Sequence, residues 1–157
     1  MRSRVTEWFE TKIGYEKPAE DGMMKKVKEQ YVVDALSFTE AERRISEEMS
    51  SYISGAFDVI DIKKATYKEV FFSEDASADR WFKAKLQFIT IDEKTEKEKR
   101  ANVYYLVHAA NFQQAVANVQ EEMSGSMVDY VIASLAETQI MDVFEATSKL
   151  EKPEYEQ

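Results

Sequence analysis

The sequence contains few residues that could carry out catalysis. Its single histidine, His108, ends an alternating apolar segment, and no serine motif or metal-ligand spacing surrounds it. Cysteine is absent, which excludes disulfides, thiol nucleophiles and zinc–thiolate sites. Because a catalytic histidine needs a nucleophile or other partner within hydrogen-bond reach, we interpret His108 as a strand-end residue and predict that the protein is not an enzyme.

Two pairs of adjacent glutamates, Glu47–Glu48 and Glu121–Glu122, are the best-matched acidic feature of the chain. Four carboxylates brought together could bind calcium or magnesium. Neighbouring residues on a helix, however, point about 100° apart and do not face each other. We therefore interpret the four glutamates as solvent-facing helix residues, and we expect neither a metal nor a cofactor.

Two tryptophans with nearby lysines form the candidate interaction surface. Lys12 follows Trp8, and Lys83 and Lys85 follow Trp81, in each case on one face of an alternating strand pattern. An exposed tryptophan flanked by lysines can stack on a base of single-stranded nucleic acid while the lysines contact phosphates. The same residues can anchor a protein interface. A third interpretation, which we favour, is that each indole closes one end of the core.

The charge of the chain limits its partners. Acidic residues outnumber basic ones by 30 to 21, for a net charge of −9, and lysines alternate with glutamates in "DEKTEKEKR". Sequence-independent binding to duplex DNA or anionic lipid requires a positive contact surface. We therefore expect no duplex DNA partner and no membrane partner. No apolar run reaches the roughly 20 residues of a membrane helix, and "MRSRVTEWFE" lacks a secretory signal, so we expect a cytoplasmic location.

An internal repeat positions these residues. Trp8–Phe9 recurs as Trp81–Phe82, at an offset of 73 residues (81 − 8), and "EEMS" at Glu47 recurs at Glu121, at an offset of 74 (121 − 47). The changes of offset fall in segments of turn composition, where a structural repeat tolerates them. The chain is thus interpreted as two copies of one structural unit.

Each copy is predicted to have the order strand, strand, helix, strand. In the first copy, alternating apolar residues predict strands over 8–15 and 27–35, helical spacing predicts a helix over 38–52, and a strand-like segment covers 57–72. The second copy repeats this pattern. Its last segment, 129–144, also has helical propensity, but the repeat favours a strand there.

The helices have recognisable starts and apolar faces. Ser37 with Glu40, and Asn111 with Gln114, have the spacing of a capping box. Because each helix must cover a sheet, we expect its apolar face to be core. The six residues of these faces that we predict to be buried are Phe38, Ile45, Met49, Phe112, Val119 and Met123.

The sequence predicts an α+β fold. Neither copy could bury a core alone, so we expect residues 1–72 and 80–147 to form one compact domain about a pseudo-twofold axis. A mainly antiparallel sheet would carry two helices on one face. The segment 73–79 is predicted to be a connecting turn, and the polar tail 148–157 is predicted to fray.

Three stretches, "WFETKIGYEK", "KEQYVVDALSFTEAE" and "DRWFKAKLQFITIDEKT", resemble an uncharacterised family, a domain of unknown function of Bacteroidetes and of their phages and mobile elements. The resemblance covers nearly the whole chain. It implies a mobile-element accessory protein and brings no catalytic residues. We expect a non-enzymatic binding or assembly module that contacts a protein partner or itself. The alternative is a single-stranded nucleic-acid-binding protein that uses the face carrying Trp8 and Trp81.

Overall fold

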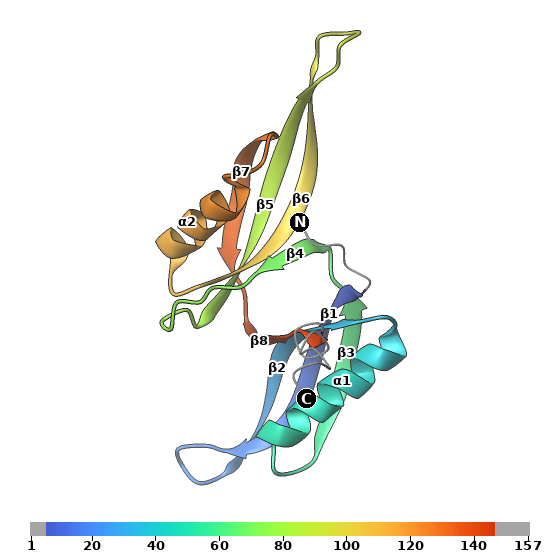
Figure 1. The fold of residues 1–157 in the computed structure, drawn as a ribbon. Helices are drawn as coiled ribbons and strands as arrows, with labels where there is room; N and C mark the ends of the chain where they lie inside the picture. Colours follow the sequence, from blue (N-terminus) through green and yellow to red (C-terminus); the bar gives the residue numbers. More distant parts are fainter. Residues whose placement is uncertain (1–5, 147–157) are drawn as a thin grey trace, which may run out of the picture. The chain divides into compact units, whose positions relative to one another are not determined.

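The computed structural model describes residues 6–146, in which one order of strands and helices occurs twice (Figure 1). Each copy has two long strands, one helix and two further strands, so the predicted repeat is confirmed. The last segment of each copy is a strand broken into two, and the helical alternative for 129–144 is wrong. The first copy comprises β1 (Glu7–Pro18), β2 (Met24–Ala35), α1 (Phe38–Tyr52), β3 (Phe57–Lys64) and β4 (Tyr67–Phe71). The second comprises β5 (Arg80–Ile91), β6 (Glu98–Ala109), α2 (Phe112–Met123), β7 (Asp129–Glu137) and β8 (Ile140–Phe144).

The chain folds into two compact units, each with its own mixed, mostly antiparallel sheet and its own helix. The α+β class is therefore confirmed. The expected single sheet with two helices on one face is wrong, because each unit has its own sheet and its own helix. The expected packing of the two copies into one compact domain stays a prediction. In Figure 1, α1 lies against the strands of the first unit and α2 against those of the second. The predicted pseudo-twofold relation between the copies stays a prediction.

The two copies exchange their last strands. The strand order is β3-β1-β2-β8 in the first unit and β4-β6-β5-β7 in the second, so each sheet contains one strand from the other copy. Both exchanged strands pair in parallel, β8 with β2 and β4 with β6, whereas the other pairs are antiparallel. The first unit therefore ends at Ala65 and resumes at Ile140, and the expected boundary at residues 72–80 differs from this division.

Local hydrogen bonds begin both helices as the sequence predicts. The backbone N–H of Glu40 donates to Ser37 Oγ at 3.1 Å, and that of Gln114 donates to Asn111 Oδ1 at 2.8 Å. The side chains of Glu40 and Gln114 in turn accept from the amide one residue before each cap, at 3.2 and 2.6 Å. Two otherwise unpaired donors are thus satisfied at each helix start.

The helix faces form the predicted cores with one correction. Ile45, Met49 and Val119 are fully buried, and Met123 is 8% exposed. The prediction is wrong for the first residue of each helix, because Phe38 is 53% exposed and Phe112 is 50% exposed. A helical side chain leans toward the N-terminus, so a side chain at the first position projects beyond the turn that covers the sheet.

Neither described helix is long and apolar enough to cross a membrane.

Candidate functional site

The tryptophans of the candidate interaction surface are buried. Trp8 and Trp81 are each 2% exposed. Trp81 stacks on His108 with ring centroids 4.2 Å apart and meets Phe72 edge-on at 5.7 Å. The packing interpretation of the two tryptophans is confirmed, and neither indole offers a free face on which a base could stack.

The lysines near the tryptophans do not surround an exposed aromatic ring. Lys12, Lys83 and Lys85 are all half-buried. Lys83 directs its Nζ over the ring of Tyr67 on β4, at 5.3 Å from the centroid. This cation–π contact ties the ammonium group to its own sheet. The candidate surface thus loses the arrangement that the nucleic-acid alternative requires.

His108 holds the chain next to the exchanged strand β4. The backbone N–H of Ser73, just beyond β4, lies 3.5 Å from His108 Nδ1. Asn118 of α2 donates to the backbone carbonyl of His108 at 2.9 Å. The histidine therefore joins β6, the helix and the exchanged strand, which agrees with a structural role.

Asp34 has the corresponding position in the first unit, where it faces Trp8 as His108 faces Trp81. Its carboxylate is fully buried and accepts from the backbone N–H of Ala146, just beyond β8, at 2.7 Å. It also accepts from Arg44 Nη1 at 3.3 Å and from the Thr6 hydroxyl at 3.1 Å. Such partners replace the hydration that a carboxylate loses on burial. We interpret Asp34 as the anchor of the exchanged strand β8.

The paired glutamates do not converge on a cation. Glu47 binds Arg43 on the helix surface at 3.2 Å, and Glu48 lies 4.0 Å from Arg44. Within residues 6–146, no group of three or more histidine or acidic side chains has an arrangement that could hold a metal ion.

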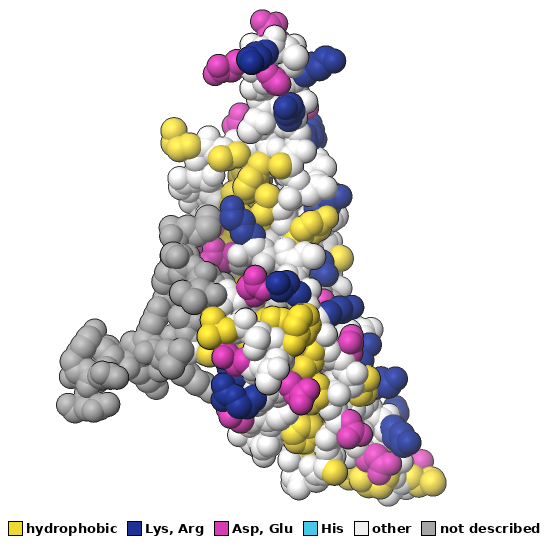
Figure 2. All heavy atoms as spheres, turned by 90° about the vertical axis from the view of Figure 1, so that its right-hand side faces the viewer, with side chains coloured by type: hydrophobic (Ala, Val, Ile, Leu, Met, Phe, Trp, Pro, Cys, Tyr) yellow, Lys and Arg dark blue, Asp and Glu magenta, His cyan; other side chains and the backbone are white. Residues whose placement is uncertain are grey.

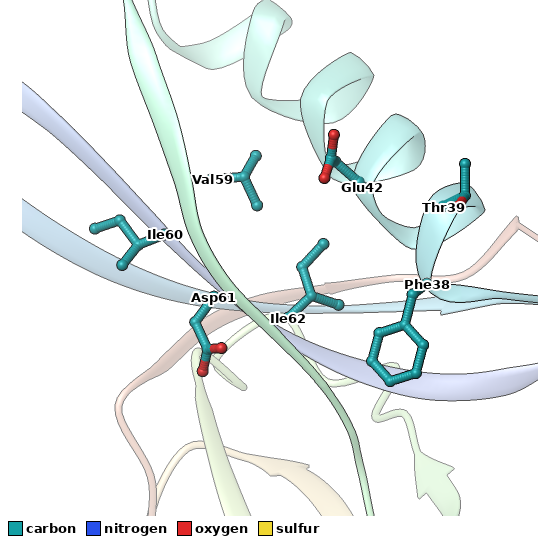
Figure 3. Close-up of a pocket in the computed structure, with 7 residues that line it drawn as sticks. All are labelled: Phe38, Thr39, Glu42, Val59, Ile60, Asp61 and Ile62. Atoms are coloured by element: carbon teal, nitrogen blue, oxygen red, sulfur yellow. The ribbon is translucent and has the colours of Figure 1, made fainter.

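A groove lies between α1 and the edge strand β3 (Figure 3). It encloses about 340 Å³, and its lining residues are Phe38, Thr39 and Glu42 of α1 and Val59, Ile60, Asp61 and Ile62 of β3. Figure 3 shows Val59 and Ile62 pointing toward the helix, and Ile60 and Asp61 pointing away from it. The groove is therefore apolar on its floor and carries Glu42 on its helical wall.

Strand β3 is an edge of its sheet, since it pairs with β1 and with no other described strand. A bulge opposite Lys12 and Ile13 places Ile60 outside the regular ladder. Gly14 on β1 makes room for the Ile60 side chain, because a Cβ at residue 14 would lie 2.6 Å from Ile60 Cδ1. Ile60 also lines a second hollow of about 780 Å³ beside the β1–β2 hairpin. Both hollows border the same edge.

The second unit repeats this geometry. Phe112 begins α2 as Phe38 begins α1, and β7 is an edge strand as β3 is. Ile132 and Leu135 of β7 pack on the core of their unit. The bulge also recurs, opposite Lys85 and Leu86. Each unit thus has a half-exposed phenylalanine at the start of its helix and an edge strand in its sheet.

Sequence reasoning missed these edges because it assigned one sheet to both copies. One signal was present in β3, where Asp58, Asp61 and Lys63 interrupt the apolar pattern. Charged residues of this kind are typical of edge strands, which use them to avoid pairing with other chains.

Surface charge around these sites is mixed. On the face drawn in Figure 2, lysine and arginine side chains are interspersed with aspartate and glutamate, and apolar side chains lie between them. Opposite charges within a Debye length, about 8 Å at physiological ionic strength, largely cancel each other's field. This face therefore has the character of a polar protein surface and not of a phosphate-binding one.

Comparison with known proteins places the chain in a family. Residues 7–146, which span both repeats, match the family described as "Domain of unknown function (DUF4494)". The chain belongs to this family. No curated protein matches the chain. The exchanged strands β4 and β8 lie inside the matched residues, so the family domain covers both units.

Proposed function

We propose that the protein is a non-enzymatic binding module that recognises an extended polypeptide segment by strand addition at β3. The observation that carries this proposal is the groove of about 340 Å³ in which the half-exposed Phe38 faces an edge strand. The bound segment would pair with the outer side of β3 and place alternate side chains in the groove.

In strand addition, affinity and specificity come from different contacts. Main-chain hydrogen bonds to an edge strand contribute affinity, and pockets for every second side chain contribute selectivity. Aromatic residues are favoured anchors of such interfaces. Full burial of a phenylalanine contributes about 1.5–3 kcal/mol, so covering the exposed half of Phe38 contributes about 1 kcal/mol.

The floor of the groove fits an apolar ligand side chain. Val59 and Ile62 point into it from β3 (Figure 3). Glu42 stands on the helical wall, opposite this floor. A carboxylate there favours a ligand with a basic or hydrogen-bond-donating residue next to its apolar anchor. The first unit is thus suited to a segment of alternating apolar and polar residues.

A protein partner also fits the rest of the chain better than nucleic acid does. The two indoles are buried, and basic and acidic side chains are interspersed on the face drawn in Figure 2. His108, the one residue considered for catalysis, and Asp34 both hold exchanged strands through hydrogen bonds. As a biological setting we propose a cytoplasmic accessory role in a Bacteroidetes phage or mobile element, supported by the sequence resemblance alone.

The test begins with peptides selected from a random-sequence display library against the full chain. We expect the selected peptides to have alternating apolar residues and to protect β3 amides from hydrogen–deuterium exchange. Phe38→Ala should weaken binding about tenfold, a change of about 1.4 kcal/mol. Tyr52→Ala is the matched control, because Tyr52 is 67% exposed at the other end of α1 and does not line the groove.

Two results would contradict the proposal. One is the failure of any peptide to bind the folded chain. The other is binding that leaves β3 unprotected, because strand addition must slow exchange of the edge amides that it engages.

A further inference from the structure

We infer that β7 in the second unit is a second strand-addition site, and that its ligand is a basic extended segment with alternating apolar residues. The inference rests on the strand-addition function proposed above for β3. It adds a separate site with a different ligand chemistry, so that one chain could engage two different segments.

The geometry of the second site follows from the repeat. Phe112 is 50% exposed at the first position of α2, and β7 pairs only with β5 among the described strands. Ile132 and Leu135 occupy the repeat positions of Val59 and Ile62, at an offset of 73 (132 − 59 and 135 − 62). Both pack on the core of the second unit from the side of the helix.

The β7 edge lacks the charges that protect β3. Only the first and last residues of β7, Asp129 and Glu137, are charged. At the offset of 73, three charged residues of β3 are replaced by uncharged ones in β7. The pairs are Asp58 with Val131, Asp61 with Ser134, and Lys63 with Ala136. Because charged side chains discourage pairing at a sheet edge, β7 is the more receptive of the two strands.

The surroundings of β7 determine the charge of its ligand. The sequence has no lysine, arginine or histidine between His108 and Lys149. The charged residues of α2, β7 and the loop that joins them are therefore all acidic: Glu121, Glu122, Asp129 and Glu137. Such a surface attracts a basic ligand and speeds its association.

One basic residue reaches this edge, because Arg80 of β5 binds Glu137 at the end of β7 at 3.4 Å. The other basic residues of β5 lie on the other face of the sheet. Lys83 and Lys85 alternate along β5 with Ala84 and Leu86, which belong to the core beneath α2. Successive residues of a strand point to opposite faces, so both lysines point away from the helix. Lys83 reaches toward Tyr67 on β4, at the other edge of the sheet. Beyond the Arg80–Glu137 pair, a ligand side chain on the helix side thus meets acidic and apolar groups.

Exposed apolar residues near β7 explain why the ligand should carry apolar side chains as well as basic ones. Met127 and Val128, in the loop before β7, are 99% and 40% exposed, and Val131 within the strand is 37% exposed. They add exposed apolar surface within β7 and just before it. A second copy of the chain is the poorer occupant, because it would bring its own acidic strip, in a molecule of net charge −9, against this one.

The test uses a fluorescent peptide of about nine residues in which valine alternates with lysine, a length that suits a typical strand. A matched peptide has glutamate in place of lysine, and a third has proline in place of the valines and so cannot donate along the edge. We expect the lysine peptide to bind the full chain at least tenfold more tightly than either control, with an affinity that falls as salt rises. It should also slow amide exchange within Asp129–Glu137.

Variants of the protein locate the site. Ala136→Lys installs the residue that the first copy has at Lys63, and we expect it to weaken lysine-peptide binding about tenfold. Ala136→Ser is the control, since residue 136 is exposed and serine adds no charge; its affinity should be unchanged. Circular dichroism checks that both variants are folded. The comparison of the three peptides uses the unaltered chain and so does not depend on the variants.

The outcomes separate this inference from the proposed function. Equal binding of the lysine and glutamate peptides, or lysine-peptide binding without protection of β7, overturns the inference. If library peptides still protect β3, the proposed function survives that result. If no peptide protects either edge, both fail.

Discussion

Arg80 and Glu137 form across β5 and β7 the same ion pair that Glu7 and Lys64 form across β1 and β3, with the two charges exchanged. The closest N–O distances are 3.4 Å in the second unit and 2.7 Å in the first. The residues correspond at an offset of 73 (80 − 7 and 137 − 64). The repeat therefore keeps an ion pair between the two strands, although the sign of the charge at each position is reversed.

This relationship predicts that the charges of the second pair can be exchanged. Arg80→Glu alone should cost about 0.2–1 kcal/mol, a typical range for exposed pairs, because it places two carboxylates together. Adding Glu137→Lys should recover most of that loss by recreating the arrangement of the first unit. Urea denaturation of the two single variants and the double variant measures the coupling. Strictly additive effects would show that the pair contributes nothing.

The buried pair of Asp34 and Arg44 should contribute much more than its exposed neighbour. The Arg44 side chain is 9% exposed and that of Arg43 is 61% exposed. Arg44→Ala leaves a buried carboxylate without its cation and should cost about 3–5 kcal/mol. Arg43→Ala, the matched control on the same helix, should cost less than about 1 kcal/mol. Equal denaturant midpoints for the two variants would contradict the proposed anchoring role of Asp34.

The stability that Tyr31 contributes should be lost at alkaline pH. Burial raises the pKa of Tyr31 above its ordinary value of 10.0, and the hydrogen bond that it donates to Glu29 at 3.0 Å raises the pKa further. The folded state therefore keeps this proton at a pH where the unfolded state releases it. Stability from this group is complete below pH 10 and declines as pH rises above that value.

Urea midpoints between about pH 8 and 11 test this dependence around the tyrosine pKa of about 10. Tyr31→Phe should reduce the alkaline decline, whereas Tyr52→Phe, at a side chain that is 67% exposed, should leave it as it is. An identical alkaline decline in the wild type and Tyr31→Phe would show that this tyrosine is not responsible.

The two tryptophans should not respond to nucleic acid. Both are 2% exposed, so a labelled single strand should leave tryptophan fluorescence unchanged across a salt series. Duplex DNA should bind negligibly at physiological salt, because the net charge is −9. Fluorescence anisotropy and tryptophan quenching measure both expectations. Quenching that disappears in Trp8→Ala with Trp81→Ala would restore stacking as a function.

Substitutions in α1 should distinguish its buried face from its first residue. Ile45 is fully buried, and Ile45→Ala should cost about 2–5 kcal/mol through lost packing and a cavity. Phe38 is 53% exposed, and Phe38→Ala should cost only about 1 kcal/mol. Thermal or urea unfolding compares the two variants. A larger loss for Phe38→Ala would mean that its ring belongs to the core and does not serve as a ligand anchor.

Much of the fold could be predicted because it depends on neighbours in the chain. The repeat, the four strand-and-helix segments of each copy, and both capping boxes follow from periodicity and from hydrogen bonds over a few residues. The side-chain oxygen of Ser37 caps α1 by accepting from the backbone N–H of Glu40, three residues later in the chain. Ile45 and Met49 are four residues apart on one helix face, and both are buried. Contacts between residues this close in the chain can be predicted from the local sequence pattern.

The candidate sites depend on contacts that local sequence does not specify. The segment 57–72 has the composition of strands throughout, yet β3 adds to the sheet of its own copy and β4 to the other. That choice leaves β3 and β7 at one edge of each sheet and puts the exchanged strands β8 and β4 at the other edge. Asp34 and His108 become the acceptors that hold the exchanged strands. The alternation of a strand tells which faces its side chains point to but not which strand lies beside it. Pairing partners are selected by long-range packing, and only the tertiary structure decided them.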